Sequence, residues 1–269
     1  MMGRAQRRRF TLIELLVVVS IIAILAAMLL PVLSKTRRQA KMTLCMNNLR
    51  ELGMMLNMYS GDNDGYYPRR KVGESQLGPR HALFFKASGM PAVDDRSTYD
   101  GYIDLDITMD CPLSPVGSCA SRYDTVTTEI WSSYAMFYGS RYETAQPKSA
   151  MLRVGDRPLY NGKTFDILAG DFDRRDKVGT FNQGAHPDGQ VMDFFSCIYK
   201  GQYVMGLYWN TNNPGTIRGP IDRSFLRDDG STFIMKRIYQ TDSRTTLISD
   251  QPGRSTAQAN ASQYLPQIQ

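Results

Sequence analysis

Two hydrophobic patterns follow one another in the first sixty residues. The run from Leu15 to Leu33 contains 19 residues and no charged side chain. As a helix it covers roughly 28 Å, close to the hydrocarbon thickness of a bilayer. An apolar segment in lipid can satisfy its own backbone hydrogen bonds only as a helix. The pattern therefore predicts one membrane-spanning helix near the amino terminus.

After Ser34 the apolar residues recur every three or four positions, at Cys45, Leu49, Leu52, Leu56 and Tyr59. This spacing is typical of an amphipathic helix that packs on a domain. The stretch 60–68 is rich in Gly, Asp and Asn and contains Pro68, which together end a helix. We expect one helix from about Thr11 to Tyr59, with its first half in lipid and its second half on a globular domain.

The rest of the chain is expected to be α+β with more strand than helix. Six segments rich in aromatic and β-branched residues are expected strands: 130–138, 164–169, 190–199, 203–209, 232–239 and 245–248. Strands that follow a single helix predict an antiparallel sheet laid on that helix. The predicted divisions are a basic leader 1–9, a membrane half 10–33, an amphipathic half 34–60, a globular domain 61–250 and a poorly ordered polar tail 251–269.

The positive charge of the chain is concentrated at the two ends of the apolar run. The net charge is +6, but residues 1–50 hold 9 Lys or Arg and one acid, whereas residues 51–269 hold 23 bases and 25 acids. The net charge of residues 51–269 is therefore close to zero, which argues against a nucleic-acid-binding surface in that part of the chain. Bases on both sides of the apolar run leave its orientation open.

The start of the chain resembles a known leader. Arg7-Arg8-Arg9 followed by Phe10-Thr11-Leu12-Ile13-Glu14 and an apolar helix is similar to the prepilin-type leader of type IV pilins and type II secretion pseudopilins. The resemblance implies that a prepilin peptidase cuts before Phe10 and methylates the new amino terminus. It also implies that Glu14 pairs with the amino-terminal charge of a neighbouring subunit in a filament.

Three further features follow from the same resemblance. Pro31 stands where pilin helices commonly carry a proline that bends the helix or locally melts it. The amino terminus is expected in the cytoplasm, with a single pass through the cytoplasmic membrane and the domain outside. Arg9 departs from the family, which usually has Gly before the cut, and such a side chain could slow or block cleavage.

Parts of the body resemble one subgroup of prepilin-like proteins. Cys45-Met46-Asn47-Asn48-Leu49 and Cys111-Pro112 match segments of that subgroup. Its carboxy-terminal pattern, a His, about nine residues and then Asp-Gly, is altered here, because His186 is almost adjacent to Asp188-Gly189.

Cys45, Cys111, Cys119 and Cys197 would lie outside the cytoplasm, where disulfides persist. Four cysteines allow three pairings. We favour two bonds. One joins Cys45 to Cys111 and ties the helix to the first long loop, and the other joins Cys119 to Cys197. A local Cys111–Cys119 bond is the alternative.

Patterns of known catalytic sites are not found in the body. The sequence contains 2 histidines and no nucleophile-elbow, zinc-protease or phosphate-loop motif. Asp171, Asp173 and Asp188 belong to an acidic region that could bind calcium, or could simply form turns between strands. We therefore expect no enzymatic activity and no cofactor other than this calcium alternative.

These observations predict a pilin-like or pseudopilin-like filament subunit. Its expected partners are a prepilin peptidase, other pilin-like subunits and the membrane, and no nucleic acid. The competing hypothesis is a membrane-tethered binding or enzymatic domain that never polymerises.

Overall fold

The computed structural model describes residues 11–71, 82–85, 91–113, 129–139, 151–157, 159–160, 163–171, 174–176, 182–183, 197–199, 202–204, 221–238, 245–249 and 261–266. The chain divides into two compact units, Met1–Lys41 and Met42–Gln269. The first unit holds the amino-terminal part of the long helix, and the second holds the rest of that helix with the strands.

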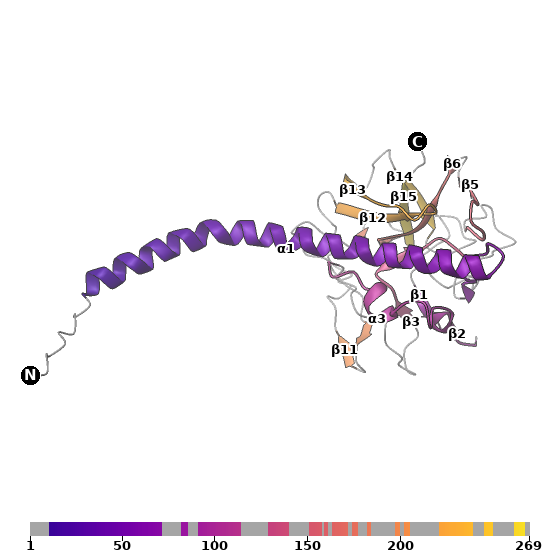
Figure 1. The fold of residues 1–269 in the computed structure, drawn as a ribbon, viewed down its shortest axis with the longest axis horizontal. Coiled ribbons are helices and arrows are strands. Elements are labelled where there is room, and N and C mark those ends of the chain that lie inside the picture. Colours follow the sequence, from indigo (N-terminus) through magenta and orange to yellow (C-terminus); the bar gives the residue numbers. More distant parts are fainter. Residues whose placement is uncertain are drawn as a thin grey trace, which may run out of the picture. The chain divides into compact units, whose positions relative to one another are not determined.

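Helix α1 spans Leu12–Asp62 and confirms the predicted long helix (Figure 1). It ends three residues beyond the expected Tyr59, in a turn where the Gly65 amide donates to the Ser60 carbonyl over 2.8 Å. Asp64 and Gly65 have φ values of 51° and 79°. Such left-handed backbone is a common way to end a helix, and Gly adopts it without steric cost.

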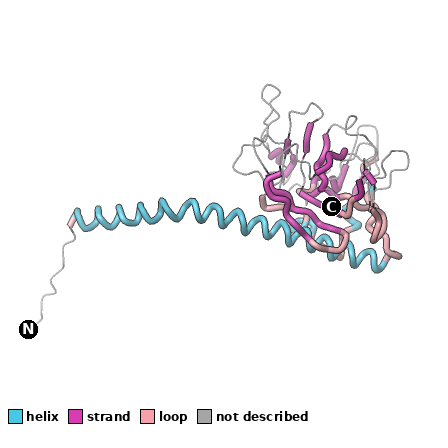
Figure 2. Tube along the Cα trace, turned by 90° about the horizontal axis from the view of Figure 1, so that it is seen from above, coloured by secondary structure: helices cyan, strands magenta, loops and turns pink. Residues whose placement is uncertain are grey.

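The main sheet has the strand order β13-β12-β7-β4 and is antiparallel throughout. Its strands are β4 (Tyr134–Met136), β7 (Ile167–Asp171), β12 (Ile221–Arg227) and β13 (Thr232–Ile238). Figures 1 and 2 show the strands of the second unit beside the carboxyl half of α1. An antiparallel sheet packed on one long helix is the α+β layout that the sequence predicts.

Two hydrophobic clusters take alternate residues of the same strands, as the two-residue period of a strand requires. Tyr134, Met136 and Leu226 belong to the larger cluster, which includes the buried stripe of α1: Cys45, Leu49, Leu52, Met55 and Leu56. Ala135, Phe137 and Phe225 belong to the second cluster. The helix approaches the sheet closely at Gly53, where an added Cβ would lie 2.9 Å from Leu226 Cδ1.

The remaining elements form smaller sheets and short helices. One sheet has the order β2-β1-β3, another β14-β15-β8-β9, and two hairpins pair β5 with β6 and β10 with β11. Their bounds are β1 Ala82–Phe85, β2 Val93–Asp94, β3 Glu129–Trp131, β5 Leu159–Tyr160, β6 Lys163–Thr164, β8 Arg174–Asp176, β9 Asn182–Gln183, β10 Cys197–Tyr199, β11 Gln202–Val204, β14 Thr245–Ser249 and β15 Ala261–Pro266, with the 3-10 turn Arg96–Thr98 and helix α3, Leu105–Thr108.

The expected strand 130–138 is in fact two strands in different sheets. β3 pairs with β1, whereas β4 pairs with β7. Between them the Ser132 hydroxyl accepts a hydrogen bond from the Tyr134 amide over 3.0 Å and donates to the Met109 carbonyl over 3.1 Å. Local bonds of this kind compete with a continuous strand ladder, which explains the break.

Two observed strands differ from the sequence predictions: one was not predicted, and the other lies in a segment that was expected to be poorly ordered. β12 was not expected, because four of the seven residues in its sequence IDRSFLR are charged or polar. β15 lies within the tail that was expected to be poorly ordered, yet it pairs with both β14 and β8. Backbone pairing on both sides stabilises this segment despite its polar composition.

Candidate functional site

The first turn of α1 is closed by a reciprocal pair of side chains. The Thr11 amide and hydroxyl both donate to Glu14 Oε2 over 2.8 Å, and the Glu14 amide donates to the Thr11 hydroxyl over 3.2 Å. This is a capping box, which satisfies backbone donors that a helix start otherwise leaves free. Glu14 is exposed, and a carboxylate accepts about four hydrogen bonds, so it retains capacity for another cation or donor.

Behind this cap, the large apolar side chains of the first unit are exposed. Leu12 is 83% exposed, and the others through Leu33 are between 47% and 74% exposed. A helix that is apolar all round belongs in a protein interior or in a membrane. In the part of the chain that the structure describes, α1 is the one helix long and apolar enough to cross a membrane.

Pro31 lies inside α1, and the helix continues through it. Proline has no N–H, so the Ala27 carbonyl loses its usual donor four residues later. The following turns carry extra side-chain bonds, because the Ser34 hydroxyl donates to the Pro31 carbonyl and the Thr36 hydroxyl to the Val32 carbonyl. The structure therefore shows no local melting at this proline.

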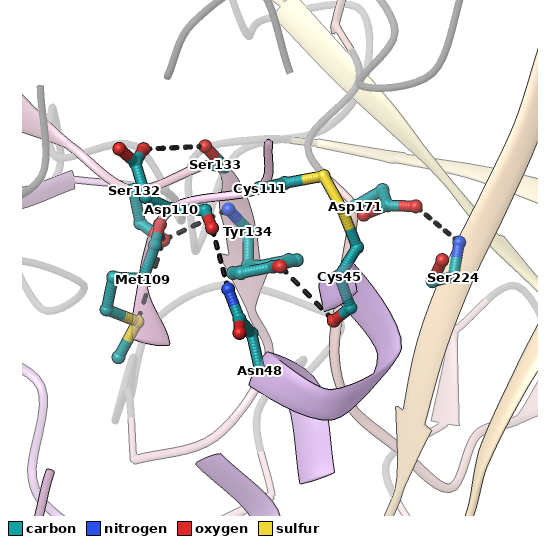
Figure 3. Close-up of a disulfide and its surroundings, with 10 residues drawn as sticks. All are labelled: Cys45, Asn48, Met109, Asp110, Cys111, Ser132, Ser133, Tyr134, Asp171 and Ser224. Carbon is teal, nitrogen blue, oxygen red and sulfur yellow. Dashed lines mark hydrogen bonds between the residues drawn. A yellow bond between two sulfur atoms is a disulfide. The ribbon is translucent and has the colours of Figure 1, made fainter. Parts of the chain in front are cut away.

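A disulfide attaches the second half of α1 to the domain. Cys45 and Cys111 are bonded, with their Cα atoms 5.0 Å apart, and both are buried. This confirms the disulfide predicted between the helix and the first long loop. Figure 3 shows the bond beside the strand that carries Tyr134.

Polar bonds on successive turns of α1 continue the attachment. The Asn48 side-chain amide donates to the Asp110 carbonyl over 2.7 Å, and the Thr108 hydroxyl donates to Glu51 Oε2 over 3.0 Å (Figure 3 shows the first). Positions 45, 48 and 51 of the helix thus meet positions 111, 110 and 108 in antiparallel order. The sequence reasoning missed Asn48 and Glu51, although their three-residue spacing from Cys45 was a usable signal.

Tyr134 completes this attachment from the sheet. Its hydroxyl donates to the Cys45 carbonyl over 3.2 Å (Figure 3). Burial raises the pKa of Tyr134 well above its ordinary value, so the hydroxyl keeps its proton and remains a donor at physiological pH. Helix, loop and sheet are thereby fixed around one cysteine.

The structure places few of the other predicted site residues. Asp171, at the end of β7, is buried and accepts a hydrogen bond from the Ser224 amide (Figure 3). Asp173, Asp188, Cys119, Arg9 and Phe10 lie outside the described residues. Cys197 lies in β10, opposite Val204. Among the described residues, no group of three or more His, Cys, Asp or Glu side chains could hold a metal ion.

Two known proteins are similar to parts of this chain. Type II secretion system core protein G of Pseudomonas aeruginosa is 36% identical over 102 residues, and type IV wide pilus major component PilA4 of Thermus thermophilus is 47% identical over 57 residues. These matches cover 38% and 21% of this chain. The chain spans 66% of the length of the first relative and 44% of the second.

No protein-family model and no solved structure matches the chain. The long apolar helix and the antiparallel sheets give an α+β layout that is consistent with a pilin fold. By these two matches the chain is similar to type IV pilin-like and type II secretion pseudopilin proteins.

Proposed function

We propose that this protein is a structural, non-enzymatic subunit of a type II secretion or type IV pilus-like filament, anchored in the cytoplasmic membrane and assembled through α1. One observation carries the proposal: a helix whose apolar half is exposed all round is fastened by its other half to a folded domain. Lipid covers such a surface in the membrane, and the same surfaces of other copies cover it in a bundle of helices.

Glu14 gives the assembly its register. It is the one charged residue between Phe10 and Ser34. A carboxylate among packed apolar helices is costly unless it meets a cation. Cleavage before Phe10 by a prepilin peptidase creates a new amino-terminal cation, and an incoming subunit can place Glu14 against that charge. In the separate subunit, the Thr11 donors hold the carboxylate until then.

Substitution of Glu14 separates assembly from anchoring. Glu14→Leu should leave the chain in the carbonate-resistant membrane fraction but lower the yield of sheared filaments at least tenfold. Glu51→Gln is the matched control, since Glu51 is the other glutamate of α1 and lies on the domain. Unchanged filament yield with Glu14→Leu would favour a membrane-tethered domain that does not polymerise.

Processing is tested at the amino terminus of the protein isolated from membranes. The proposal expects an N-methylated Phe10 as the first residue, and Arg9→Gly should increase the processed fraction, because a narrow residue before the cut suits the family's peptidase. A start at Met1 or Met2 in both forms would contradict the proposed processing and the register it supplies.

A further inference from the structure

Two methionines in the second half of α1 are exposed to solvent. Met54 is 58% exposed and Met58 is 59% exposed, whereas Met55, which lies between them in the sequence, is 1% exposed. At about 100° per residue, Met54 and Met58 lie roughly 40° apart around the helix, and Met55 lies roughly 100° from Met54. The two exposed thioethers therefore share one side of α1, whereas the side chain of Met55 is in the core.

The exposure of this pair is unusual among the methionines of the second unit. Methionine is one of the residue types most often found inside proteins. Among the described methionines of this unit, Met54 and Met58 are the most exposed. Two others are partly exposed, Met46 and Met235. Four more are at most 8% exposed: Met42, Met109, Met136 and Met151.

Exposure matters because an oxidant can convert the apolar methionine side chain into a polar one. With hydrogen peroxide, a lone pair of the thioether sulfur attacks one peroxide oxygen, the O–O bond breaks and the sulfur–oxygen bond of a sulfoxide forms. The sulfur loses two electrons and the peroxide gains them. The departing hydroxide takes the proton of the transferred oxygen and leaves as water. Methionine sulfoxide reductases reverse the change.

Oxidation at these two positions changes a surface and spares the core. In the second half of α1, the exposed large apolar side chains are Leu44, Met54 and Met58. None of the three belongs to either hydrophobic cluster. We propose that Met54 and Met58 are an oxidation site, at which peroxide makes this side of α1 polar while the domain stays folded.

The test treats the full chain in detergent micelles with hydrogen peroxide and follows one peptide by mass spectrometry. Trypsin releases residues 51–69 as a single fragment that contains Met54, Met55 and Met58. Its fragment ions therefore compare the exposed and buried methionines under identical conditions. Met54 and Met58 should gain oxygen at least about tenfold faster than Met55. In the chain unfolded in urea, the three rates should agree within about twofold.

Variants and thermal melts test whether the domain tolerates the modification. Met54→Leu with Met58→Leu should leave the peptide almost free of added oxygen, whereas the matched Met55→Leu should leave oxidation at the other two positions unchanged. The oxidised wild type should melt within about 3 °C of the untreated protein. The double variant, treated in the same way, reports the effect of oxidation at the remaining methionines.

Three results would overturn the proposal. The first is oxidation of Met55 as fast as Met54 in the folded chain, because exposure would then not select the site. The second is no oxidation of Met54 or Met58, which would show that another surface, such as a second copy, covers this side of α1. The third is a melting temperature that falls by more than about 3 °C in the oxidised wild type but not in the treated double variant, which would make the modification damage to the fold.

Discussion

At the scale of single residues, two buried tyrosines differ in whether their hydroxyl has a partner. The Tyr134 hydroxyl donates to the Cys45 carbonyl, whereas the Tyr67 hydroxyl has no hydrogen-bond partner among the described residues. Tyr134→Phe should therefore lower the free energy of unfolding by about 1 kcal/mol. Tyr67→Phe should be neutral or slightly stabilising. Urea unfolding of the full chain in detergent measures both, and equal losses would show that Tyr67 has a partner such as a bound water.

Buried tyrosines also set a pH dependence. Burial raises the pKa of Tyr67 to about 12, with the nearby Asp228 carboxylate adding to the shift. Burial likewise raises the pKa of Tyr99, Tyr134 and Tyr138. Tyrosines of the unfolded chain ionise near pH 10, so the folded state holds these protons more tightly. Their contribution to stability is complete below pH 10 and is lost as the pH rises towards 12 and beyond.

Melting temperatures measured between pH 8 and pH 12 test this dependence. As far as the tyrosines determine them, the melting temperatures should be constant up to about pH 10 and should then fall. Tyr67→Phe should make the fall shallower, because one of the raised groups is gone. A fall of the same steepness in the wild type and in Tyr67→Phe would contradict the assigned role of Tyr67.

The sequence predicts some of these residues and not others. The Cys45–Cys111 bond was favoured among the three possible pairings because it ties the long helix to the first long loop, and the structure contains it. The buried pair of Arg70 and Asp95, with Arg70 Nε 3.7 Å from Asp95 Oδ2, could not be foreseen. Charged residues are usually exposed, and nothing in their spacing of 25 positions indicates contact. Burial of a charge depends on the tertiary fold, which residue type alone does not reveal.

At the scale of elements, the disulfide is a covalent connection between α1 and the segment 105–113, which contains α3. It closes a loop of 66 residues. The chain-entropy relation gives about 4 kcal/mol of stabilisation for a loop of that length. Replacing Cys45 and Cys111 by Ala should therefore lower the free energy of unfolding by up to about this amount. Asn48→Ala, which removes one neighbouring hydrogen bond, should cost about 1 kcal/mol.

Denaturant unfolding of the double variant measures this stabilisation, and mass spectrometry of non-reduced peptides identifies the bond. Both cysteines are at most 1% exposed. A mild reductant should therefore cleave the bond only as fast as the domain opens. Rapid reduction under native conditions, or a loss no larger than that of Asn48→Ala, would contradict the anchoring role of the disulfide.

Helices and strands could be predicted where the residue composition and the spacing of the apolar residues favoured the same type of element. β13 combines Phe233, Ile234 and Ile238 with β-branched neighbours and was expected almost to its observed bounds. β12 is flanked by β13 and β7, and this central position buries Arg223 and Ser224. Its tertiary position overrides the usual preference of those residue types for solvent. The split between β3 and β4 depends on the Ser132 hydroxyl, whose contact with Met109 is 23 residues distant in sequence.

At the scale of the whole molecule, the two compact units depend on different environments. The large apolar side chains from Leu12 to Leu33 are exposed, whereas the buried stripe of α1 begins at Met42. Deleting residues 1–33 therefore removes no member of either hydrophobic cluster and leaves the disulfide intact. A fragment 34–269 should leave the membrane fraction and melt within about 4 °C of the full chain, a shift that corresponds to less than about 1 kcal/mol. Near-ultraviolet circular dichroism and thermal melts measure this, with Cys45→Ala in the same fragment as a destabilised control. A fragment without fixed tertiary signals would show that the apolar helix stabilises the domain as well as anchoring it.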